Sequence, residues 1–82
     1  MPRGTRRPAA QHTLRADDCR RHPGTWIEIS VYVSSQSAKT VGRHIVRANP
    51  LPQYGPPGAF ETRTRLVDDG ALLEARYLGG AR

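Results

Sequence analysis

The sequence predicts a small α+β protein, in which a β-α-β-β domain at 25–82 follows a disordered basic arm at 1–24. Three observations predict this organisation: strict apolar alternation at 25–33, apolar residues at helical spacing between 38 and 48, and a two-residue turn signal at 69–70. A chain of 82 residues holds one domain at most. The simplest arrangement is a three-stranded mixed sheet with one helix on one face.

The arm, residues 1–24, combines high charge with little apolar content. It holds six arginines and two aspartates, and Leu14 is its one sizeable aliphatic residue. Such a composition does not offset the entropy lost on folding, so we expect disorder, with a short helix near 9–21 as the alternative.

The first strand is expected at 25–33, TWIEISVYV, because apolar β-branched residues recur at every second position. The side chains expected on the core face are those of Ile27, Ile29, Val31 and Val33. The opposite face should then carry Trp26, Glu28, Ser30 and Tyr32.

A helix is expected next, since apolar residues are spaced 3, 4 and 3 at Ala38, Val41, Ile45 and Ala48. Ser35 or Ser37 can cap its start, and Asn49-Pro50 ends it. Cations recur every fourth residue on the solvent side, at Lys39, Arg43 and Arg47. This row either faces an anion or is simply solvated. The proline-rich residues 50–59 that follow are expected to form a stiff loop.

The last element is expected to be a β-hairpin, because Asp69-Gly70 is a strong two-residue turn signal. The core face would hold Phe60, Thr62, Thr64 and Leu66 from one strand and Leu73, Ala75 and Tyr77 from the other. This register pairs Arg65 with Glu74 and places Arg63 opposite Arg76. The arginine pair is unfavourable unless an anion lies beside it.

The face of the sheet turned away from the helix has no predicted cover except the arm or a partner. Aromatic side chains interleaved with arginines on such a face suit base stacking and phosphate contact. Exposed aromatic and leucine side chains equally suit self-association of a small domain. The residues expected there are Trp26, Tyr32, Arg63, Arg65 and Arg76, with Glu28, Glu74, Leu72 and Leu78.

No phosphate-binding, metal-binding or catalytic motif in the sequence has the residue spacing that its chemistry requires. The stretch VYVSSQSAKTVG, 31–42, resembles a phosphate loop, but Val33 and Ala38 stand where that motif needs glycine. His12, Cys19 and His22 match no standard zinc spacing and lack a fourth ligand. No acid–base pair or triad is placed by spacing. We therefore expect no enzyme, no metal and no cofactor.

The net charge of +6 predicts an anionic partner, and a generally arginine-rich proteome is the alternative explanation. No secretory signal or membrane span is evident, so we expect a cytoplasmic protein. The predicted function is a small basic nucleic-acid-binding protein, for DNA or RNA. The alternative is a protein-interaction module or homodimer using the uncovered sheet face. The predicted nucleic-acid contacts are Arg3, Arg6, Arg7, Lys39, Arg43, Arg47, Arg63, Arg65 and Arg76. The predicted interface residues are Trp26, Tyr32, Leu72 and Leu78.

Overall fold

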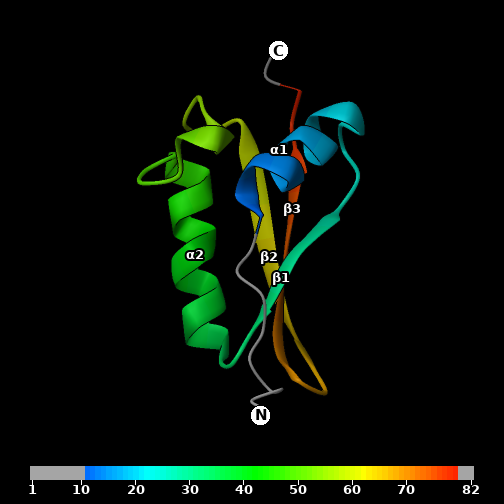
Figure 1. Ribbon diagram of the computed structural model, residues 1–82, viewed down its shortest axis with the longest axis vertical. Helices are drawn as coiled ribbons and strands as arrows, with labels where there is room; N and C mark the ends of the chain where they lie inside the picture. Colours follow the sequence, from blue (N-terminus) through cyan, green and yellow to red (C-terminus); the bar gives the residue numbers. More distant parts are fainter. Residues whose placement is uncertain (1–10, 80–82) are drawn as a thin grey trace.

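The computed structural model describes residues 11–79 and confirms the α+β class (Figure 1). Its elements in chain order are α1 (His12–Arg21), β1 (Ile27–Tyr32), α2 (Ser35–Arg47), the 3-10 turn η1 (Pro52–Tyr54), β2 (Phe60–Val67) and β3 (Gly70–Tyr77). The sheet order is β1-β3-β2, and both outer strands run antiparallel to β3. The predicted mixed sheet is therefore wrong, because the last strand inserts between the first two.

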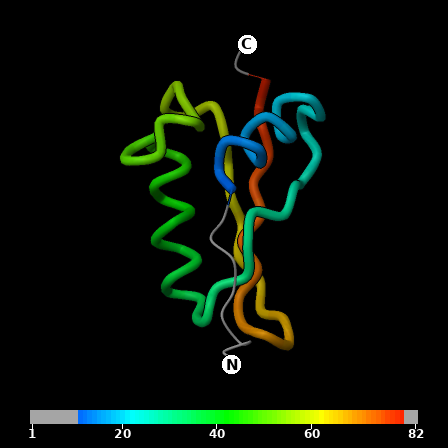
Figure 2. Tube along the Cα trace, in the orientation of Figure 1, coloured from blue at the N-terminus to red at the C-terminus, as the bar shows by residue number. Residues whose placement is uncertain are grey.

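A second helix, α1, corrects the prediction of a single helix. It lies within residues assigned to the disordered arm, and it packs beside β1 and the C-terminal part of β3 (Figure 2). Its buried side chains are only Ala16 and Cys19, and the Cys19 thiol lies 3.7 Å from the Ala75 carbonyl oxygen. Small buried residues produce almost no amphipathic pattern, so the sequence reads as unstructured although the helix is packed.

Polar contacts fasten α1 to the turn before β2. Arg20 donates hydrogen bonds from Nη2 to the carbonyl oxygens of Gln53, at 2.9 Å, and Gly55, at 2.8 Å. His12 Nδ1 lies 2.8 Å from the hydroxyl of Tyr54, which is fully buried. Arg20 and His12 thus help to pack α1 against the rest of the protein, a role that is not evident from two polar residues in the sequence.

Strand β1 contains a bulge that changes which side chains face the core. Its register with β3 shifts between Glu28 and Ser30, so Ile29 is an extra residue in the strand. Ile27 and Ile29 pack in the core as predicted. Beyond the bulge the faces exchange: Tyr32 packs against the core, Val31 lies opposite Leu72 on the outer face, and Val33 is 87% exposed. The predicted core positions of Val31 and Val33 are therefore wrong.

Helix α2 forms as predicted, with one difference at each end. Ser34, rather than Ser35 or Ser37, is the N-cap, and its hydroxyl accepts from the Ser37 amide at 3.1 Å. Ala48 adopts a left-handed conformation with φ 55° and ends the helix two residues before Pro50.

The hairpin forms, but its register differs from the predicted one by two residues. Val67 pairs with Gly70, so Asp68 and Asp69 make the turn. A slip of two leaves every side chain on its predicted face and changes only its partner. Arg63 therefore lies opposite Glu74, not Arg76, and Arg76 lies opposite Glu61. The predicted unfavourable arginine pair is therefore absent, and it gives no reason to expect an anion beside it.

Gly70, the first residue of β3, lies close to the backbone of β1. Its φ is +145°, and a Cβ added there would lie 2.1 Å from the Tyr32 carbonyl oxygen. The glycine is needed for close approach of β3 to β1, not for the turn itself.

One hydrophobic core lies between the sheet and both helices. Tyr54 and Phe60 pack edge to face at its centre, with ring centroids 5.1 Å apart. Ile45 from α2 and Cys19 from α1 are also fully buried in it. Leu66, predicted in the core, is 78% exposed because the hairpin extends beyond the first turn of α2 (Figure 1).

Candidate nucleic-acid interface

The solvent side of α2 carries Lys39, Arg43 and Arg47, and all three are exposed. Four residues of α-helix rise about 6 Å, so the three side chains form a row along the helix axis. None of the ion pairs found within residues 11–79 involves this row. We call these three residues the α2 cation row.

The cation row borders a groove between α2 and the edge strand β2, with a volume of about 470 Å³. The residues lining it are Lys39, Gly42, Arg43, Val46, Arg47, Thr62, Arg63 and Thr64. No carboxylate is among them, so uncompensated positive charge dominates the groove.

Gly42 sets the floor of this groove by letting α2 approach β2 closely. A Cβ at this position would lie 3.0 Å from Thr62 Oγ1 and 3.4 Å from Leu73 Cδ1. The glycine interrupts the apolar stripe of the helix, and its neighbours on β2 are threonines. Hydroxyls and a cation row on opposite walls of one groove suit a polar, anionic ligand.

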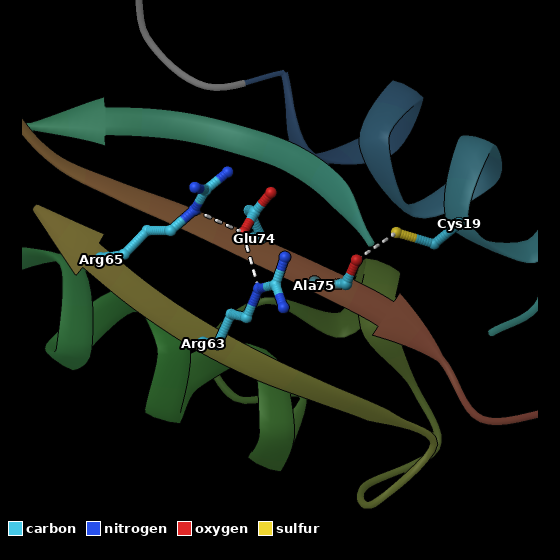
Figure 3. Close-up of polar contacts among 5 residues, drawn as sticks. All are labelled: Cys19, Arg63, Arg65, Glu74 and Ala75. Carbon is cyan, nitrogen blue, oxygen red and sulfur yellow. Dashed lines mark hydrogen bonds and ion pairs between the residues drawn. The ribbon is translucent and has the colours of Figure 1, made fainter. Parts of the chain in front are cut away.

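The outer face of the sheet holds a charge network centred on Glu74. Arg63 Nε lies 2.7 Å and Arg65 Nε 3.3 Å from Glu74 Oε1, as Figure 3 shows. Burial of Glu74 raises its pKa, but the hydrogen bonds and positive charges of the two arginines outweigh this, so the pKa lies below its usual value. Arg76 pairs separately with Glu61 at 3.2 Å.

Arginine side chains also cover the apolar part of this face. The guanidiniums of Arg63 and Arg76 lie 4.3 and 4.6 Å from the centre of the Trp26 ring, and Trp26 is half-buried. Leu72, opposite Arg65, is only 5% exposed. Arginines of the sheet therefore cover Trp26, and Leu72 is buried, so less apolar surface is open on this face than the sequence predicted.

These positions divide the predicted contacts into three groups. Lys39, Arg43 and Arg47 meet in one groove. Arg63, Arg65 and Arg76 gather on the outer face but are paired with glutamates. Arg3, Arg6 and Arg7 lie outside the described residues. The four predicted interface residues do not form one surface: Trp26 lies under two arginines, Leu72 is buried, Tyr32 is on the core face, and Leu78 is 45% exposed beyond β3.

Of three further groups on the core side, Cys19 and Tyr54 are buried and His12 is half-buried. Burial raises the pKa of the Cys19 thiol to about 11 and also raises that of the Tyr54 hydroxyl, and it lowers the pKa of His12. Cys19 is therefore protonated and a poor nucleophile near neutral pH. Residues 11–79 contain no group of three His, Cys, Asp or Glu side chains arranged to hold a metal ion.

Sequence reasoning found the cation row but missed the groove. Gly42, Thr62 and Thr64 became groove residues only because β2 is an edge strand beside α2. The one sequence signal was Gly42, which stands in the middle of an otherwise good helix.

Comparison with protein-family models, curated proteins and solved structures finds no match for this chain. Within the described part of the chain, both helices are too short and too polar to cross a bilayer.

Proposed function

We propose that this is a small non-enzymatic nucleic-acid-binding protein and that the groove between α2 and β2 holds the phosphate backbone. The observation that carries the proposal is the α2 cation row, which lines a groove free of carboxylates. We do not assign phosphate contact to Arg63, Arg65 or Arg76, because their guanidiniums already pair with glutamates or stack on Trp26.

Phosphate contact by the cation row makes binding depend on salt. Each neutralised phosphate releases condensed counterions and contributes about 0.9 to the slope of log K against log salt on duplex, or about 0.7 on a single strand. Losing both Arg43 and Arg47 should therefore reduce the slope by about 1.8 on duplex and by about 1.4 on a single strand. Contacts to phosphates carry no sequence information, so we expect a groove that holds the backbone to bind without strong sequence preference.

The test is fluorescence anisotropy with labelled single-stranded and duplex oligonucleotides of mixed sequence, at several salt concentrations. The variant Arg43→Ala/Arg47→Ala is compared with Arg15→Ala/Arg21→Ala, which removes the same charge from exposed positions on α1. We expect the first pair to lose at least about tenfold in affinity at low salt and the second pair much less. Equal losses would show that binding follows net charge and not the groove. The same assay on an Arg3/Arg6/Arg7→Ala variant measures the contribution of the N-terminal arginines.

A second candidate function is contact with a protein or a second copy of the chain, at the hairpin end of the sheet. Val33 and Leu66 are 87% and 78% exposed there, although neither is a polar residue. Light scattering over a range of concentrations tests self-association. A mass that rises with concentration and returns to the monomer in Leu66→Ser supports it, whereas a constant monomer mass excludes a homodimer through this end.

A further inference from the structure

Arg63 connects the groove to the outer face of the sheet. The residue lines the groove together with the cation row, while its guanidinium lies over the Trp26 ring on the other side of the strand. Strand β2 is at the edge of the sheet, so no further strand of residues 11–79 separates the two surfaces along this edge. A flexible ligand can therefore pass from the groove over the edge of β2 to Trp26.

The two surfaces have different chemistry. The groove carries the uncompensated charge of the α2 cation row, which suits phosphates. The outer face pairs Arg63 and Arg65 with Glu74, and Arg76 with Glu61, so its charge is largely compensated. What the outer face offers instead is a half-buried indole with the planar guanidiniums of Arg63 and Arg76 over its ring, and unpaired bases stack on guanidinium planes as well as on aromatic rings.

We infer that the ligand is single-stranded nucleic acid, with its phosphates along the α2 cation row and at least one base stacked on the Arg63 guanidinium where it lies over Trp26. This inference rests on the proposed function and names its ligand class. A duplex keeps its bases stacked and paired within the helix, so it offers phosphates to the groove but no base to Trp26. Charge and stacking together thus favour a single strand.

Trp26 is the single tryptophan of the chain and lies under the Arg63 guanidinium, so its fluorescence reports on a base bound there. The experiment titrates the full-length protein with three ligands: a 12-nucleotide thymidine strand, an abasic strand of the same length, and a 12-base-pair duplex. Affinity is measured by anisotropy of labelled ligands and stacking by Trp26 emission. We expect the thymidine strand to change the emission along the same binding curve and to bind about 5- to 100-fold more tightly than the abasic strand. The duplex should bind without changing the emission.

Two outcomes separate the inference from the function on which it rests. Binding of all three ligands with equal affinity and unchanged Trp26 emission would overturn the single-strand inference and leave backbone binding intact. No binding of any ligand at low salt would overturn both. A Trp26→Leu variant should lose the preference for the thymidine strand over the abasic strand but keep its duplex affinity. Its fold is checked by circular dichroism, and if it unfolds, the emission of the unmodified protein decides.

Discussion

The charge network on the outer face allows a direct energetic test of the hairpin register. In the structure Glu74 lies opposite Arg63, whereas a turn at 69–70 would place it opposite Arg65. Two double-mutant cycles, Arg63→Ala with Glu74→Ala and Arg65→Ala with Glu74→Ala, measure the coupling of each pair separately.

The distances and exposures predict unequal couplings. Arg63 Nε is 2.7 Å from Glu74 Oε1 and its side chain is 45% exposed, whereas Arg65 Nε is 3.3 Å away and its side chain is 59% exposed. A hydrogen bond to a charged group contributes about 1.5–3 kcal/mol when shielded from water. Solvent screening lowers this, because exposed pairs contribute only about 0.2–1 kcal/mol. We expect about 1–2 kcal/mol for Arg63–Glu74 and less than about 1 kcal/mol for Arg65–Glu74.

The assay is urea unfolding followed by circular dichroism for the parent, the three single variants and the two double variants. A coupling with Arg65 larger than that with Arg63 would refute the observed register, since Glu74 would then lie closer to Arg65 than to Arg63. The pH dependence gives an independent check. The pKa of Glu74 is lowered on folding, so its contribution is present above the ordinary glutamate pKa of 4.5 and is lost as the pH falls below it. A Glu74→Gln variant should lose stability less steeply than the parent in this acid range.

Three further predictions concern the packing of the helices and strands. Gly70→Ala should cost about 2 kcal/mol or more, because the new Cβ would clash with the Tyr32 carbonyl oxygen at a backbone φ that side chains rarely adopt; thermal unfolding measures this, and a loss below about 0.5 kcal/mol would contradict it. The pKa of His12 is lowered on folding, so stability should fall as the pH drops below the ordinary histidine value of 6.5, and His12→Gln, compared by urea unfolding from pH 7.5 to 5, should flatten this loss. Arg20→Met should cost about 1–2 kcal/mol by removing two charge-assisted hydrogen bonds, and hydrogen exchange should show faster opening of α1 than of α2; unchanged exchange in α1 would show that Arg20 does not hold the helix.

Elements with a strong apolar period or a strong turn signal could be predicted from the amino-acid sequence alone. Apolar spacing located α2, the turn signal located the hairpin, and alternation assigned Phe60 and Leu73 to the core face. These predictions succeeded because the apolar period of a segment and the face that it buries have one physical cause.

Apolar alternation could not determine the pairing register of the hairpin, nor could it show that β1 contains a bulge. A slip of two residues leaves the faces unchanged, so the pairing of Arg63 with Glu74 was invisible to the apolar pattern. Charge pairing was the available signal, since a turn at 69–70 gives one arginine pair and one opposite-charge pair, whereas a turn at 68–69 gives two opposite-charge pairs. The bulge at Ile29 left no trace, because the β-branched alternation continues through it.

The strand order, the docking of α1 and the groove depend on contacts between distant parts of the chain. Insertion of β3 between β1 and β2 puts β2 at the edge, and Gly42 then brings α2 close enough to form a groove with it. The contacts that hold α1, through Cys19 and Arg20, join residues far apart in the chain and follow no local period. Local patterns record which side of a segment is buried, whereas the partner that buries it depends on the whole chain.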